Sequence, residues 1–283
     1  MVTRQRVGQI IVVAATCMAA LAADQIRKEF KYNVGPKASI SINNEYGPVT
    51  VRPSGTNQII VTAVLLSNKV EIDQEQIGDR VEVQSHLLAG ASKDTARVEY
   101  QVQVPTDTSV TIHSSDGPVY AEQLRADLAV VGDSAKVDVN GVADAHVHVN
   151  TLDGPITLTN ITNGHVEISS VRGDVNMNSV TGPHVIVMST SGKIHYDGDF
   201  GVGGDYQLTS HTGDIDALVP ADASVEVTAR SLRGDVENDF PLEPKKHTAF
   251  LAHSGRSFIG TAGRAASSVV IRSISGKIRF KKR

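Results

Sequence analysis

A short pattern recurs along most of the 283-residue chain, and this repeat constrains the fold more than any other feature. Each copy has an apolar–x–apolar segment, four residues, a glycine, one residue and a second apolar–x–apolar segment. Two clear copies are VHVNTLDGPITL around Gly154 and VEISSVRGDVNM around Gly173. Alternating apolar residues on both sides of the glycine predict two short strands, each with one buried face, joined by a tight corner.

The corner residues are separated by a nearly constant 18 to 21 residues. In order they are Gly117, Ala135, Gly154, Gly173, Gly192, Gly213, Gly234, Gly255 and Gly276, with a further copy at Gly47. A unit of about 20 residues cannot bury its apolar face alone, whereas stacked units bury it and pair each strand with its equivalent in the next coil. We therefore predict an all-β fold, a parallel β-solenoid (β-helix) with coils of 19–21 residues stacked in sequence order. Glycine suits a corner that needs a positive φ.

A second regularity lies three residues before the corner, where most copies carry a small polar residue. These residues are Asn44, Ser114, Thr151, Ser170, Ser189, Ser210, Ser231 and Ser273. Side chains of this kind can hydrogen-bond the turn backbone or the same position in the next coil. We interpret the row as structural, because no serine differs from the others and no G-x-S-x-G motif accompanies them.

The chain divides into three segments. Residues 1–22 are expected to form a signal peptide, because Arg4 and Arg6 precede an apolar run that is too short to span a bilayer and ends in small residues. Residues 23–105 hold the Gly47 copy and longer alternating runs, which predict an N-terminal antiparallel β cap on an otherwise open edge. Residues 106–283 are expected to form about nine coils.

The last strand of the sequence is basic, with five Lys or Arg residues among the final seven. As the expected end of the rod, this charge would discourage end-to-end pairing. The alternative is a weak contact with an anionic surface.

The motifs SSDGPV, TLDGPI, SVRGDV and ISGKIRF, with VEYQVQVP before them, resemble a bacterial exported family of unknown function that is described as an adhesin. The resemblance covers roughly Phe30 to Phe280. It implies an exported β-solenoid protein of the cell envelope, and it brings no catalytic residues with it. The adhesin description is itself an inference from the fold.

One outward-facing position, eight residues before the corner, carries a histidine or an aspartate in five copies. They are Asp127, His146, His165, His184 and Asp205. Imidazoles about 4.8 Å apart could hold zinc or copper, so His146, His165 and His184 are the candidate metal ligands. The alternative is that each histidine starts a strand at a solvated turn and was copied with the repeat, since a flat row supplies a closed tetrahedral site poorly. No resident cofactor is predicted.

A second row is acidic. Asp174, Asp214 and Asp235 follow the corner directly, and Asp216 and Glu237 lie two residues further on. Stacking in sequence order would place Asp214 and Asp235 about 5 Å apart, near the separation in retaining glycosidases. Any in-register solenoid produces that distance, so turn formation by aspartate is the alternative interpretation.

The formal net charge of −4, with thinly spread Lys and Arg, excludes the dense basic surface that nucleic acids require. We predict a protein that is not an enzyme: an exported, adhesin-like binding or scaffolding module in the periplasm, envelope or extracellular space. Its partner would be a protein or polysaccharide, and the mature chain would have no transmembrane segment. The alternative is a carbohydrate-active lyase or hydrolase, which the absence of Trp and the scattered Tyr120, Tyr196 and Tyr206 disfavour.

Overall fold

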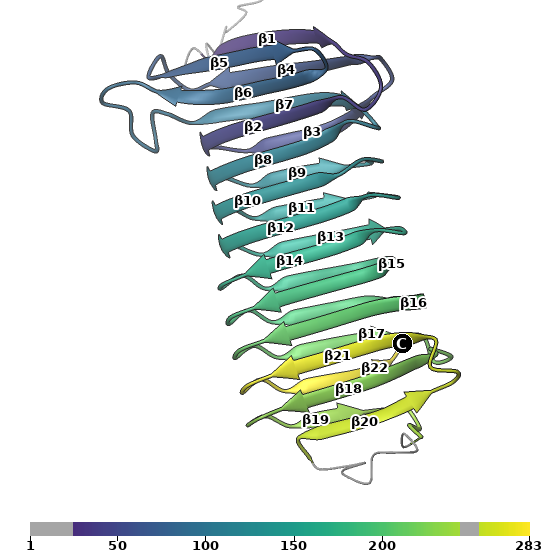
Figure 1. Cartoon of the computed structure of the whole chain (residues 1–283). Helices are drawn as coiled ribbons and strands as arrows, with labels where there is room; N and C mark the ends of the chain where they lie inside the picture. The colour runs from purple at the N-terminus through teal and green to yellow at the C-terminus, as the bar shows by residue number, and fades with distance from the viewer. Residues whose placement is uncertain (1–24, 244–254) are drawn as a thin grey trace, which may run out of the picture.

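The computed structural model describes residues 25–243 and 255–283, so the expected signal peptide lies outside the described residues. All 22 elements assigned within those ranges are β-strands, which confirms the all-β prediction. They stack into a long rod (Figure 1). In the part of the chain that the structure describes, no helix is long and apolar enough to cross a membrane.

Each coil of the rod consists of a first strand, a corner and a second strand. The first strands are β2 (Ser39–Tyr46), β8 (Ser109–Asp116), β10 (Leu128–Ser134), β12 (His146–Asp153), β14 (His165–Ser170), β18 (Val225–Ser231) and β21 (Ser267–Ser273). The second strands are β3 (Val49–Ser54), β9 (Val119–Glu122), β11 (Val137–Asn140), β13 (Ile156–Ile161), β17 (Ile215–Val219), β19 (Val236–Asn238) and β22 (Ile278–Lys282). Two long strands, β15 (Val175–Ser189) and β16 (Ile194–Ser210), each form the second strand of one coil and the first strand of the next.

Equivalent strands of neighbouring coils pair in parallel and in register, as the repeat predicts. His146 pairs with His165, and Val175 pairs with Ile194, so equivalent repeat positions stack directly. The first strands together form one face of the rod, here called the first-strand face, and the second strands form the second-strand face. Their inward residues, such as Val149 and Ile168, are buried in one continuous core.

The corners require glycine for a reason other than the expected one. Among the described corner glycines, only Gly47 and Gly154 have φ in the left-handed region. At Gly173, a Cβ atom would overlap the carbonyl oxygen of Gly154 in the neighbouring coil. The expectation of a positive φ at every corner is therefore wrong, and close approach of the neighbouring backbone excludes the side chain instead.

The small polar row before the corner is structural, as predicted. Ser170 Oγ donates a hydrogen bond to Gly173 O at 2.9 Å and accepts one from Gly173 N at 3.1 Å. Ser273 Oγ accepts from Gly276 N at 2.8 Å, and the Asn44 side chain donates to Gly47 O at 3.0 Å. These buried side chains satisfy the corner backbone.

The coils do not stack in sequence order, which corrects the prediction. β21 pairs in parallel with β16 on one side and β18 on the other, and β22 lies in the same way between β17 and β19. The coil with its corner at Gly276 is therefore inserted between the coils of Gly213 and Gly234. Figure 1 shows the yellow β21 and β22 between green strands. Consequently the basic last strand does not form the end of the rod.

The copy around Gly255 is not a coil. Its downstream strand, β20 (Ser257–Ala262), runs antiparallel along β18, with Ser257 opposite Arg230. In this copy the first apolar residue, Phe258, comes three residues after the glycine and not two, which agrees with a strand outside the stacking register of the others. The strands β18, β19 and β20 thus form the terminal layer of the rod (Figure 1).

The N-terminal segment lies at the opposite end. It contains β1 (Ile26–Asn33), β4 (Gln58–Leu65), β5 (Val70–Ile77), β6 (Arg80–Leu87) and β7 (Val98–Pro105). The β6 strand pairs in parallel with β2 and antiparallel with β5. The β7 strand pairs in parallel with β3 and antiparallel with β4, and β4 pairs antiparallel with β1. Beyond the Gly47 coil, β6 and β5 therefore continue the first-strand face, and β7, β4 and β1 continue the second-strand face.

Candidate functional site

The histidine row is formed as the repeat predicts, on the first-strand face. His165 stacks on His146 with ring centroids 4.8 Å apart and planes 15° apart, whereas His184 is tilted, with its centroid 6.0 Å from that of His165. At one end of the row, Asp127 Oδ1 accepts a hydrogen bond from His146 N at 3.0 Å. At the other end, His184 is in register with Asp205.

Stacking face to face directs the nitrogen lone pairs sideways, parallel to one another, and not toward a common point. Within residues 25–243 and 255–283, no group of three or more His, Cys, Asp or Glu side chains is arranged to hold a metal ion. His148, next to the row, lies 3.5 Å from the Glu167 carboxylate. Metal binding by His146, His165 and His184 stays a prediction.

The acidic row is tied to the backbone of neighbouring coils. Asp174 Oδ1 accepts from Lys193 N, and Asp214 Oδ1 accepts from Lys277 N, both at 2.8 Å. Because the Gly276 coil lies between those of Gly213 and Gly234, Asp214 and Asp235 are two strand spacings apart. The predicted separation of about 5 Å between those two carboxylates is therefore wrong.

The basic C-terminal strand lies against these carboxylates. Arg279 contacts Asp216 at 2.6 Å and Asp214 at 3.4 Å, which raises the pKa of the guanidinium, chiefly through the hydrogen bond to Asp216. Lys277 forms an ion pair with Glu237, and Arg283 forms ion pairs with Asp197 and Asp199.

The remaining two charges of the strand are also engaged. Lys281 lies 3.6 Å from Glu237, and Lys282 Nζ lies 5.3 Å from the centre of the Phe240 ring. The basic charge of the tail is thus directed to groups of the same molecule, and contact with an anionic surface stays a prediction.

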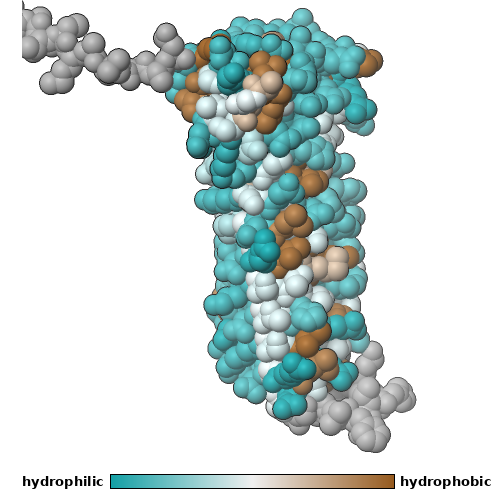
Figure 2. All heavy atoms as spheres, turned by 90° about the vertical axis from the view of Figure 1, so that its left-hand side faces the viewer, coloured by the Kyte–Doolittle hydropathy of each residue, from teal (hydrophilic) through white to brown (hydrophobic). Residues whose placement is uncertain are grey.

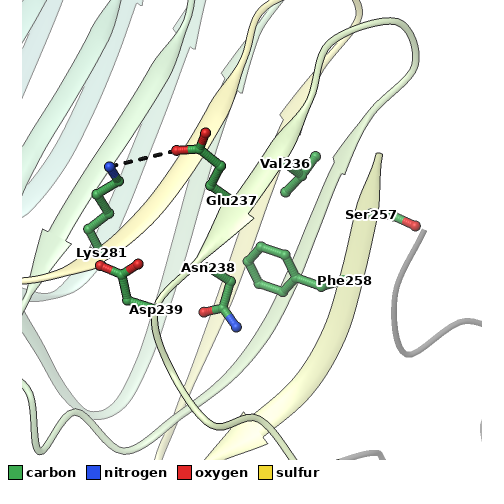
Figure 3. Close-up of a pocket in the computed structure, with 7 residues that line it drawn as sticks. All are labelled: Val236, Glu237, Asn238, Asp239, Ser257, Phe258 and Lys281. Carbon is green, nitrogen blue, oxygen red and sulfur yellow. Dashed lines mark ion pairs between the residues drawn. The ribbon is translucent and has the colours of Figure 1, made fainter. Parts of the chain in front are cut away.

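A small hollow of about 410 Å³ lies at the end of the rod beside β19 and β20. Figure 3 shows its lining, with Phe258 and Val236 on one side and the Glu237–Lys281 ion pair on the other. Asn238 and Asp239 complete the polar part. The Glu237 carboxylate forms ion pairs with Lys277 and Lys281 of the neighbouring coil. Its charge is therefore already balanced within the molecule.

A larger groove, of about 1030 Å³, crosses the first-strand face near the same end. It is lined by residues of β15, β16, β21, β18 and β20, and we call it the arginine groove after Arg230, Arg256 and Arg272. All three arginines are exposed. Arg230 and Arg272 are in-register neighbours, and Arg256 Nη1 donates to Leu232 O at 3.4 Å.

The charge of this groove is unbalanced. No carboxylate lines it, and its remaining ionisable side chain is His211. Arg230, Arg256 and Arg272 form no ion pair with any described residue, in contrast to Arg279 and Arg283 on the second-strand face. Cationic side chains that form no ion pair with a described residue remain available to an external anion.

Apolar side chains lie beside these arginines. Leu232 is 49% exposed, and Ile274 and Ile259 also line the groove. Figure 2 looks onto the corner edge of the rod and shows brown apolar side chains spaced along it. Other exposed apolar residues near the corners are Leu152 and Val171, which occupy the same repeat position in adjacent coils.

The sequence interpretation missed the arginine groove. Arg230 and Arg272 occupy the same position, four residues before their corners, so the repeat carried a signal. In sequence order, however, the Gly255 copy separates them. Only the insertion of β21 beside β18 makes them neighbours.

Comparisons with known proteins identify a family to which the chain is similar. The family model described as Toastrack DUF4097 matches residues 38–281. A crystal structure described as a "putative cell adhesion protein" from Clostridium sporogenes is 14% identical, covering 91% of this chain and 100% of that chain at a TM-score of 0.27. One described as a "putative adhesin" from Bacteroides fragilis is 11% identical, covering 92% and 99%, at a TM-score of 0.38. No curated protein matches the chain.

Proposed function

The chain belongs to the Toastrack DUF4097 family, a family defined by a domain of unknown function, and we propose that it is a non-enzymatic module of the cell envelope or surface that binds another macromolecule. The observation that carries the proposal is the arginine groove. It combines three arginines that form no ion pair with a described residue with the exposed Leu232 and the half-buried Ile259 and Ile274, on an in-register face. Arginine is enriched at protein interfaces, and the buried centre of an interface is more apolar than the rest of the surface.

The state of the candidate catalytic carboxylates supports a binding role over a hydrolytic one. Asp174 and Asp214 accept hydrogen bonds from the backbone of the next coil, and Arg279 holds Asp214 and Asp216. A catalytic carboxyl group must reach the scissile bond, whereas these carboxylate oxygens are already engaged by the backbone or the guanidinium of the next coil. These carboxylates therefore serve the stacking of coils.

Our proposal that the protein is exported is based on the expected signal peptide, which has a basic start and a short apolar run. In this proposal the N-terminal segment acts as the cap of the rod. Its outermost strand on the first-strand face, β5, carries Glu71, Asp73 and Glu75. Charged side chains on an edge strand discourage pairing with another chain.

Sedimentation with bacterial envelope fractions tests the binding role. We expect the purified protein to sediment with envelopes, and the double variant Arg230→Gln/Arg272→Gln to sediment markedly less. The matched control is Arg125→Gln, which removes an exposed arginine from the connection before β10. Equal sedimentation of all three proteins would contradict a role for the groove.

An assay of reducing-end release from acidic and neutral polysaccharides tests the absence of catalysis. We expect no turnover by the protein, and none by its Asp214→Asn/Asp235→Asn variant. Turnover by the parent that disappears in this variant would replace the binding proposal with the carbohydrate-active enzyme.

A further inference from the structure

The arrangement of Arg230 and Arg272 is unfavourable without a ligand. The two residues are directly in register on β18 and β21, about 4.8 Å apart along the rod, and both point away from the core. Like charges at directly paired positions of a sheet destabilise it. Arg256 adds a third positive charge from the segment that leads into β20. A bound anion would remove this repulsion.

A row of apolar side chains runs beside the charged row. Leu232 and Ile274 follow Arg230 and Arg272 by two residues and line the same groove, between the arginines and the corners. Leu232 N donates to Ser273 O, which shows that the two chains remain adjacent as far as the corner. The groove thus presents cations and aliphatic groups in two parallel rows.

We infer that the arginine groove binds an acidic polypeptide segment whose carboxylates lie beside apolar side chains. This inference rests on the proposed binding function and specifies its partner. The planar guanidinium matches a carboxylate through two parallel hydrogen bonds, and two neighbouring arginines favour two neighbouring carboxylates. The apolar side chains of the segment would cover Leu232 and Ile274, removing their surface from water.

The other anionic macromolecule to consider is an acidic polysaccharide. It would supply carboxylates to Arg230 and Arg272, but it offers no row of aliphatic side chains for Leu232 and Ile274. The groove lining also contains no Tyr, Phe or Trp face. The two-row arrangement therefore favours the polypeptide.

Binding to synthetic probes tests the inference. The first probe is a short fluorescent peptide that contains Glu and Leu; the second replaces Glu with Gln, and the third replaces Leu with Gly. Polygalacturonate is the carbohydrate probe. We expect the protein to bind the first peptide most tightly and more weakly as salt rises, because exposed charges are screened.

Three variants identify the surface. Arg230→Gln/Arg272→Gln should weaken binding of the Glu–Leu peptide by about tenfold or more, as expected when charged hydrogen bonds are lost. Leu232→Ser should weaken binding of that peptide and leave binding of the Glu–Gly peptide unchanged. Arg125→Gln should bind like the parent. Without peptide, the melting temperature of the double variant should be equal to or higher than that of the parent, because the two arginines repel each other. A lower melting temperature would show that the arginines stabilise the fold.

The results separate this inference from the proposed function. Tighter binding of polygalacturonate than of every peptide, lost in the double variant and retained in Leu232→Ser, would overturn the polypeptide assignment while supporting the groove. Failure to bind any probe, with envelope sedimentation still dependent on Arg230 and Arg272, would also overturn the acidic-polypeptide inference alone. Envelope sedimentation independent of these arginines would overturn both.

Discussion

At the residue scale, each coil meets its neighbour most closely at the corner. The carbonyl oxygen of one corner occupies the space that a Cβ of the next would need, for example Gly154 O beside Gly173. The sequence predicted a glycine at the corner correctly, but it attributed the glycine to a positive φ. A periodic pattern shows that a side chain is absent at a position, and it does not show which neighbouring group excludes that side chain. The serine before the corner was easier to predict, since its hydrogen bonds are local.

Adding one methyl group at a corner tests this explanation. We expect Gly173→Ala to lower the free energy of unfolding by about 1–3 kcal/mol, because the backbone of two coils must separate. Gly55→Ala is the matched control, since its Cβ would meet nothing within 4 Å. Denaturant unfolding measures both, and equal midpoints would show that corners tolerate a side chain.

The titration of Glu237 belongs to the same scale. Its hydrogen bond with Lys277, supported by Lys281, lowers the pKa of the carboxyl below 4.5. A carboxyl with a lowered folded-state pKa stabilises the fold above its unfolded pKa, and this contribution is lost as pH falls through the folded value. In Lys277→Met, we expect the pKa of Glu237 to rise toward 4.5. Carbon-13 NMR titration of the carboxyl measures the change, and an unchanged pKa would contradict the ion pair.

At the scale of elements, the strands that the repeat failed to predict are those at the ends. β20 has the length and apolar content of a coil strand, yet it runs antiparallel on β18. At the other end, β1 and β5 likewise run antiparallel on their single neighbours, β4 and β6. An end strand pairs with one neighbour only and is not stacked between two equivalent strands. Its sequence therefore does not need the in-register pattern that identifies the repeat.

Removing the terminal layer tests its role as an end. A variant in which a short glycine–serine linker replaces residues 221–266 lacks β18, β19 and β20 and leaves β21 and β22 as the edge. We expect it to retain a β-sheet circular dichroism spectrum and to self-associate, because uncovered parallel strands pair with other chains. Light scattering after size-exclusion chromatography measures the association. A monomeric variant would show that the terminal layer is not needed as a cover.

At the scale of the whole molecule, the order of coils differs from the order of the sequence. Coils with the same period can pair in register in more than one order, so spacing alone does not determine the order. Charge did carry a signal: sequence order places Asp214 beside Asp235 and Asp216 beside Glu237, which repel one another. Inserting Lys277 and Arg279 between them alternates the signs across the sheet. The same insertion places Arg272 beside Arg230 and so creates the arginine groove.

Disulfide trapping of this coil order is the most direct test, because the groove exists only if β21 and β22 lie between the coils of Gly213 and Gly234. The chain has one cysteine, Cys17, so introduced pairs are unambiguous in a protein produced without residues 1–22. Cysteines at positions 216 and 279 are in-register neighbours, whereas those at 216 and 237 are two strand spacings apart, about 10 Å. Disulfides require Cα atoms within about 7 Å.

We therefore expect Asp216→Cys/Arg279→Cys to close a disulfide in the folded protein under mild oxidation, and Asp216→Cys/Glu237→Cys to remain reduced, as measured by mass spectrometry after thiol alkylation. A disulfide between positions 216 and 237, with none between 216 and 279, would restore the sequence order of the coils and contradict the arginine groove.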